Sequence, residues 1–206
     1  MPLAASCNRV ILGKSMLPTL EEFRERLANT TISSSTLRNQ GAPGVINQAR
    51  YFLKNLELQK FITDDETVFL KELEKQTDLL RLSFPNKSQH WGTARKAINL
   101  FLAEAYYHKY VCAGYKLEVV EAFLELPLDG QVGRFLNRES QKRGETDLPQ
   151  WKGLKYLNAK ESKLYQDFAR RIAKEKGYER VFLDVVIWQP EGIINLERGS
   201  KTKNGG

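Results

Sequence analysis

Residues 93–111 have the sequence TARKAINLFLAEAYYHKYV, and apolar side chains fall on nearly every face of the α-helix that this stretch predicts. A helix that is hydrophobic all round is typical of the buried centre of a helical protein. We therefore expect this helix to lie inside a core made by the helices around it.

Outward from this central helix, apolar residues recur at helical spacing along most of the chain. The amphipathic ranges are 20–27, 45–58, 64–82, 117–124, 130–138 and 161–176. Residues 181–188, VFLDVVIW, have the composition of a strand, but no second β-rich run lies nearby, so a buried terminal helix is an equal alternative. The sequence predicts an all-α fold.

The segment Phe84–Gln89, which contains a proline, is the expected joint between two parts of the chain. We expect an N-terminal helical lobe over residues 1–89 and a second helical lobe over 90–195, with the alternative that the two share a core. Residues 196–206 have the composition of a flexible basic tail.

Composition limits the class of protein and its partners. The 206 residues are 41% hydrophobic and 28% charged, which is the balance of a globular domain rather than a disordered chain. No run approaches the roughly 20 apolar residues that cross a bilayer, and no segment has the pattern of a secretory signal. We expect a cytoplasmic monomer without a membrane partner, associated with the nucleoid in a prokaryote. The net charge of +7 favours a polyanionic partner, most simply nucleic acid.

Metal ligands are scarce in this sequence. The chain holds two cysteines and two histidines, too few for an iron–sulfur cluster or for a zinc site with the usual four ligands. We therefore expect neither a metal nor an organic cofactor.

A turn of small residues leads into the central helix and places Lys96 in its expected first turn. Backbone amides at a helix N-terminus bind phosphate, and the helix dipole there favours a neutral amine, the nucleophilic form of lysine. The alternative is a structural lysine whose ammonium group reaches water from a buried helix.

Asp129 stands where the N-cap of the helix over residues 130–138 belongs. Its carboxylate would accept hydrogen bonds from the backbone amides of Gln131 or Val132, and by itself it is an ordinary cap. Glu104 and Glu125 are alternative carboxylates, with no positional argument for either.

Together, the two segments resemble the helix–hairpin–helix DNA glycosylase superfamily, and are most similar to its archaeal 8-oxoguanine DNA glycosylase branch. The matching patterns are Gly-x-Ala-Arg-Lys-Ala-x-Asn-Leu over residues 92–100 and Pro-Leu-Asp-x-x-Val-x-Arg over 127–134. The resemblance implies a two-lobed fold with a cleft between the lobes, Lys96 as the Schiff-base lysine and Asp129 as the catalytic aspartate. The sequence departs from the pattern at Gln131, where the superfamily carries histidine.

The resemblance also implies the DNA contacts. Gly92 and Ala94 fall on the hairpin that binds the DNA backbone, although only one of the two hairpin glycines of the superfamily is present. Arg95, Arg134 and Arg138 are the expected cationic contacts to phosphate.

Two further segments match the archaeal branch and concern the base. The segment TLRNQ, residues 36–40, implies that Gln40 lies in the base pocket. The Leu-Asp-x-x-x-Trp pattern within residues 182–188 implies that Asp184 and Trp188 contact a flipped purine, and it favours a helix there.

An enzyme that acts on a base must take that base out of the helical stack and hold it against apolar or aromatic surface, for which Trp91 is available. The resemblance implies a DNA glycosylase with AP lyase activity that excises a damaged or modified base, 8-oxoguanine among the candidates, from double-stranded DNA. The alternative is a non-catalytic helical module that binds DNA or another protein.

Overall fold

The structure is a computed structural model that describes residues 18–37 and 40–188, except for the side chain of Trp188. Within these residues the chain forms α-helices and short 3-10 helices and no strand, so the predicted all-α fold is confirmed. The α-helices are α1 (Leu20–Thr31), α2 (Val45–Lys54), α3 (Glu66–Ser83), α4 (Trp91–Tyr107), α5 (Lys109–Tyr115), α6 (Gly130–Lys142), α7 (Ala159–Glu175) and α8 (Leu183–Trp188). The 3-10 helices are η1 (Leu58–Phe61), η2 (Asn86–Ser88), η3 (Leu117–Phe123) and η4 (Arg180–Phe182). The expected tail over residues 196–206 lies outside the described residues.

Polar side chains define where several helices begin. Thr19 and Glu22 form a reciprocal capping box at the start of α1, Asp65 caps α3 and Asn158 caps α7. The predicted helix over residues 45–58 is shorter in the structure, because α2 ends at Lys54 and η1 follows as a separate element.

The strand-like run over residues 181–188 is helical, divided between η4 and α8. Its apolar residues serve two cores, because Val181 packs in one hydrophobic cluster while Leu183 and Ile187 pack in another. With no partner strand among the described residues, backbone hydrogen bonds within the segment are made by helical turns.

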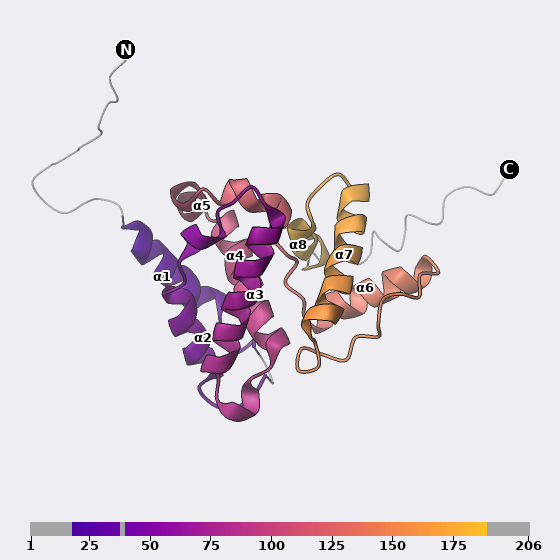
Figure 1. Cartoon of the computed structure of the whole chain (residues 1–206), viewed down its shortest axis with the longest axis horizontal. Coiled ribbons are helices and arrows are strands. Elements are labelled where there is room, and N and C mark those ends of the chain that lie inside the picture. The colour runs from indigo at the N-terminus through magenta and orange to yellow at the C-terminus, as the bar shows by residue number, and fades with distance from the viewer. Residues whose placement is uncertain (1–17, 38–39, 189–206) are drawn as a thin grey trace, which may run out of the picture.

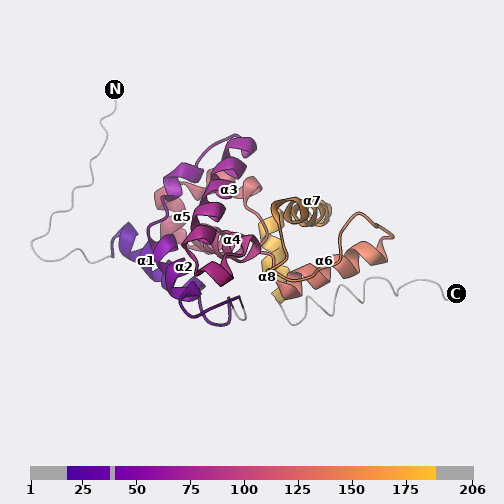
Figure 2. The same ribbon diagram turned by 60° about the horizontal axis from the view of Figure 1, so that its bottom comes forward.

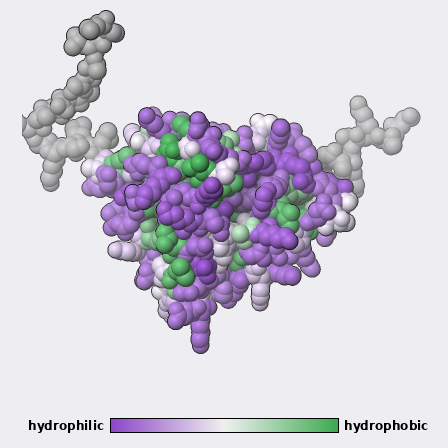
Figure 3. Space-filling view, viewed as in Figure 1, coloured by the Kyte–Doolittle hydropathy of each residue, from purple (hydrophilic) through white to green (hydrophobic). Residues whose placement is uncertain are grey.

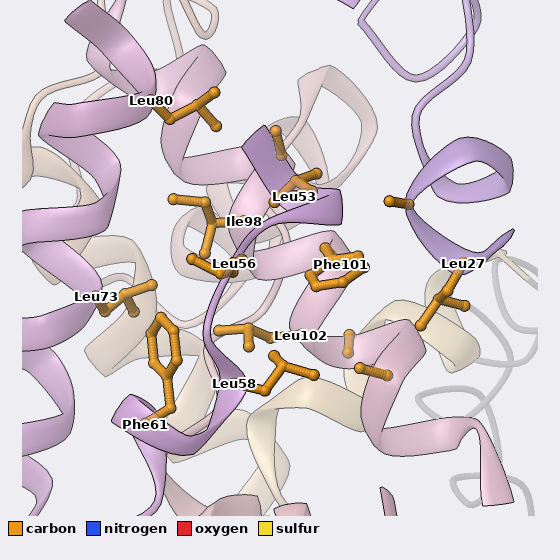
Figure 4. Packing of buried hydrophobic residues seen from close by; sticks show 14 of the residues in the cluster. Leu27, Leu53, Leu56, Leu58, Phe61, Leu73, Leu80, Ile98, Phe101 and Leu102 are labelled. Carbon is orange, nitrogen blue, oxygen red and sulfur yellow. The ribbon is translucent and has the colours of Figure 1, made fainter. Parts of the chain in front are cut away.

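Helix α4 is the central helix that its composition predicts. Figure 4 shows Ile98, Phe101 and Leu102 of this helix among leucines and phenylalanines of α1, α2, α3 and η1. These three α4 side chains are buried, as expected of a helix with apolar residues on nearly every face.

Two hydrophobic clusters make up the interior. The first contains buried residues from Leu27 to Leu124 together with Val181, and the second contains residues from Leu126 to Ile187. The expected boundary at residues 89/90 therefore falls inside the first cluster, between α3 and α4, and the sequence passes from one cluster to the other at Glu125. Figures 1 and 2 show α6, α7 and α8 together on the side away from α1.

The face of the molecule seen in Figure 3 is mainly polar. On the face in Figure 3, hydrophilic side chains predominate and apolar ones form small, separate patches. Among the residues that the structure describes, no helix is both long and apolar enough to cross a membrane.

Candidate active site

The structure brings Lys96 and Asp129 together, although they are 33 residues apart in the sequence. The Nζ atom of Lys96 lies 3.5 Å from Oδ2 of Asp129, and it also donates a hydrogen bond of 2.8 Å to the backbone carbonyl oxygen of Thr36. The side chains are 10% and 17% exposed, respectively, so both are largely shielded but can still be reached. An amine and a carboxylate thus share one partly enclosed position.

The N-cap of α6 orients the Asp129 carboxylate. Its Oδ1 atom accepts hydrogen bonds from the backbone amides of Gln131 (2.8 Å) and Val132 (2.9 Å), which confirms the predicted cap. Because Oδ1 is held in this way, Oδ2 is the oxygen that faces Lys96. Only the backbone of Gln131 takes part in the cap, so its departure from histidine leaves the cap unchanged.

Lys96 and Asp129 line a cavity of about 520 Å³, within the range of small-molecule sites. The other lining residues are Ser35, Thr36, Leu100, Pro127 and Asp184. Asp184 comes from α8, so three segments far apart in sequence contribute acidic or basic groups to the same cavity. The structure therefore places Asp184 beside the two expected catalytic residues.

Gln40 lies close to this site but lines a different cavity. Its Oε1 atom accepts a 3.0 Å hydrogen bond from the hydroxyl of Thr93, in the first turn of α4. The cavity that it lines has a volume of about 310 Å³ and includes Gly130 and Trp151. The proposed role of Trp188 concerns a side chain outside the described residues.

The structure corrects the expected DNA contact of Arg95. Its side chain is 8% exposed and donates to both carboxylate oxygens of Glu125, at 2.9 and 3.2 Å. It also donates to Glu74 and to the hydroxyl of Thr77, both at 3.1 Å. A guanidinium group that is buried and engaged in this way cannot reach a phosphate, so that prediction was wrong.

The expected hairpin contacts of Gly92 and Ala94 are wrong for a related reason. Both residues are buried in α4, and a Cβ atom added to Gly92 would lie 2.3 Å from the carbonyl oxygen of Leu154. Gly92 therefore permits close approach of the loop that contains Leu154 and Leu157, and this loop lies where the resemblance places a DNA contact of Gly92.

Trp91 contacts other side chains of the protein and does not face the cavity where a base would bind. Its indole Nε1 donates a 2.9 Å hydrogen bond to Glu74, and the guanidinium of Arg95 lies 5.1 Å from the centre of its ring system. Trp91 does not line the cavity beside Lys96, so the structure does not support the expected stacking role.

Helix α4 begins at Trp91, two residues before the expected start, and this changes the argument for Lys96. Lys96 is the sixth residue of the helix, whereas the effect of the helix dipole is concentrated in the first turn. What singles out Lys96 is therefore the nearby carboxylate of Asp129 rather than its place in the helix.

Glu125, which the sequence offered only as an alternative carboxylate, has a structural role that the sequence did not predict. It is buried and accepts hydrogen bonds from Arg95 and from the amide of Asn99, at 2.8 Å. Burial raises the pKa of Glu125, but the charge and hydrogen bonds of Arg95, with the charge of Arg180 and the hydrogen bond from Asn99, together hold the pKa below its ordinary value. Glu125 thereby ties α4 to the segment that leads into Asp129.

Of the predicted DNA contacts, Arg134 and Arg138 remain, since both are exposed on α6.

Within residues 18–37 and 40–188, no cluster of three or more histidine, cysteine, aspartate or glutamate side chains is placed to hold a metal ion. Comparisons with known protein families, curated proteins and solved structures found no match for this chain.

The close approach at Gly92 gives a stability test. Alanine usually stabilises a helix interior relative to glycine by about 1 kcal/mol, but Gly92→Ala is expected to lower the free energy of unfolding by about 1–3 kcal/mol through overpacking against Leu154. Urea denaturation measures this change. In the control variant Gly130→Ala the new Cβ meets only the tip of the Arg134 side chain, so a change within about 0.5 kcal/mol is expected. Equal losses in both variants would contradict the packing role.

Proposed function

We propose that this chain is a DNA glycosylase with AP lyase activity, with Lys96 as the nucleophile and Asp129 as the catalytic carboxylate. The observation that carries the proposal is the 3.5 Å approach of Lys96 Nζ to Asp129 Oδ2 at a cavity of about 520 Å³. In this proposal the two hydrophobic clusters correspond to the two lobes of a helix–hairpin–helix glycosylase, and the cavity belongs to the cleft between them. In this proposal α3, the short connection and α4 correspond to the helix–hairpin–helix element, with the first turn of α4 buried rather than turned to DNA.

The substrate in this proposal is a damaged purine, with 8-oxoguanine as the first candidate, in duplex DNA. The base must leave the helical stack before the chemistry, because its glycosidic bond is inaccessible within the duplex. The cavity offers the carboxylate of Asp184 as an acceptor for purine N–H groups and the apolar side chains of Leu100 and Pro127 as walls.

The first chemical step breaks the bond between the sugar and the base. Transfer of one proton from Lys96 to Asp129 leaves a neutral amine, which attacks C1′ while the C1′–N bond breaks and its electron pair leaves with the base. Asp129 then gives that proton to the departing base. As the proton passes from Asp129 to the departing base, the carboxylate that forms stabilises the positive charge at C1′.

The second step cleaves the DNA strand. The nitrogen of the adduct loses a proton while the ring oxygen O4′ gains one, so the sugar ring opens and a protonated C1′=N imine joins Lys96 to the sugar. Asp129, ionised again after it has protonated the base, then takes a proton from C2′, and the 3′ phosphate leaves by β-elimination. Both steps use groups of this chain and of the DNA, without a cofactor.

Asp129→Asn is expected to lower the single-turnover rate of base excision by about 10²–10³, the usual cost of losing one preorganised electrostatic group. DNA binding should be unchanged or tighter, because one negative charge leaves the cavity. The melting temperature should change little, since asparagine also caps helices well. Full activity in this variant, or global unfolding, would mean that Asp129 is only a structural cap.

The proposed function is tested by single-turnover assays on duplex oligonucleotides that each carry one modified base or an abasic site. We expect release of a damaged purine and strand cleavage at the abasic site, with undamaged duplex left intact. If no member of the panel is cleaved while DNA binding is preserved, the proposal fails and a non-catalytic DNA-binding module is favoured.

A further inference from the structure

A groove runs beside α6 and has no role in the chemistry described above. It consists of two cavities, of about 590 and 310 Å³, that share Arg134 and Trp151. The other lining residues are Gln40, Gly130, Gln131, Asn137, Arg138, Gln141, Gln150, Lys152, Gly153 and Leu154. We call this surface the α6 groove.

The charged side chains that line the α6 groove are all cationic. Arg134, Arg138 and Lys152 line it, and among the described residues no aspartate or glutamate does. Nor does any ion pair of the described residues involve one of these three cations. By contrast, the next cations along the same helix are paired, Lys142 with Glu139 at 2.9 Å and Arg143 with Glu175 at 2.7 Å.

Close packing and hydrogen bonds fix the wall of the α6 groove. The indole ring of Trp151 lies so close to α6 that a Cβ atom on Gly133 would be 2.2 Å from it. The side chain of Asn137 accepts a 2.6 Å hydrogen bond from the backbone amide of Trp151 and donates one of 2.8 Å to the carbonyl oxygen of Pro149. Trp151 also packs edge-on against Tyr165. The groove is therefore a shaped surface, and its side-chain amides add neutral hydrogen-bond donors to its cations.

The position of the groove connects it to the candidate active site. One end reaches Gly130, the residue after Asp129, and Gln40, which is hydrogen-bonded to α4 through Thr93. The other end reaches Gln141 near the end of α6. The helix is 13 residues long, or about 20 Å, which spans several phosphates of a DNA strand.

We propose that the α6 groove holds the sugar–phosphate backbone of duplex DNA and leads it to the cavity beside Lys96. This deepens, and rests on, the proposed glycosylase function. Unpaired cations and side-chain amides are the groups that contact phosphate oxygens in protein–DNA interfaces. In this proposal the α6 groove makes the backbone contacts that the resemblance assigned to the start of α4, where Gly92, Ala94 and Arg95 are buried.

The test compares the salt dependence of DNA binding in the full chain and in three variants, Arg134→Gln, Arg138→Gln and Lys152→Gln. Binding to a duplex that contains an abasic site is followed by fluorescence anisotropy over a range of potassium chloride concentrations. Each phosphate contact contributes about 0.9 to the magnitude of the slope of log K against log salt. The slope of each variant should therefore be smaller by about 0.9, and each variant should bind DNA about eightfold more weakly than the wild type at 0.1 M salt. Circular dichroism verifies that each variant is folded.

The matched control is Lys142→Gln, which removes a cation from the same helix outside the groove. A control slope equal to that of the wild type, with reduced slopes in the groove variants, supports the proposal. Groove variants that bind like the control overturn it, as does wild-type binding that is stronger to single-stranded RNA than to the duplex. If the groove variants have a reduced slope of log K against log salt but the wild type never forms an imine with DNA, the groove is a DNA-binding surface and the proposed glycosylase chemistry fails.

Discussion

Lys96→Gln is expected to abolish covalent trapping of the protein on DNA by borohydride, together with strand cleavage at an abasic site. The substitution keeps a polar side chain of similar length but removes the amine that forms the imine, and among the described residues no other amine lines the cavity. Residual base removal can persist, because Asp129 still stabilises the sugar cation and can guide a water molecule. Gel electrophoresis of the borohydride-reduced complex measures the effect.

The control for this prediction is Lys163→Gln, at an exposed lysine of α7 that pairs with Asp167. It should trap as efficiently as the wild type. If Lys96→Gln still becomes covalently attached to DNA, the nucleophile is another residue and the assignment of Lys96 is wrong.

Arg95→Met is expected to lower the free energy of unfolding by about 3–5 kcal/mol, the cost of removing one partner of a buried ion pair. The side chains of Arg95 and Glu125 are 8% and 6% exposed, so Glu125 would keep its charge without its ion-pair partner or have to take up a proton. Urea denaturation at neutral pH measures the loss. Because Glu125 lies on the path from α4 to Asp129, excision should also slow.

The loss should depend on pH in a definite direction. In the wild type, the folded-state pKa of Glu125 is below its ordinary value, so its ionised form stabilises the fold above that value and this stabilisation is lost as pH falls through the folded-state pKa. The difference between Arg95→Met and the wild type should therefore shrink at acidic pH. Arg81→Met, which breaks a more exposed pair with Asp78, should cost less than about 1 kcal/mol. A similar loss in both variants would contradict the structural role of the buried pair.

Local chemistry was sufficient to predict much of the fold. Asp129 was recognisable as an N-cap because it precedes a helical pattern and has the side chain that such positions favour. The central position of α4 followed from apolar residues on nearly all its faces. The strand-like segment over residues 181–188 could not be decided from composition, because the absence of a partner strand is a property of the whole fold.

The candidate site was predictable only in part. Arg95 and Lys96 are neighbours in sequence, yet one is buried against Glu125 and the other lines a cavity, since successive side chains on a helix point in different directions. Which direction is buried depends on partners 18 to 60 residues away, and no local pattern reveals them. The burial of Gly92 likewise depends on the loop that contains Leu154.

The most direct test of the central claim is to locate the covalent bond itself. Wild-type protein is incubated with duplex DNA that contains 8-oxoguanine or an abasic site, reduced with borohydride, digested with protease and nuclease, and analysed by mass spectrometry. We expect a sugar adduct on the peptide that contains Lys96, and none on the other lysine peptides. An adduct on a different lysine, or DNA binding with no adduct on any lesion of the panel, would contradict it.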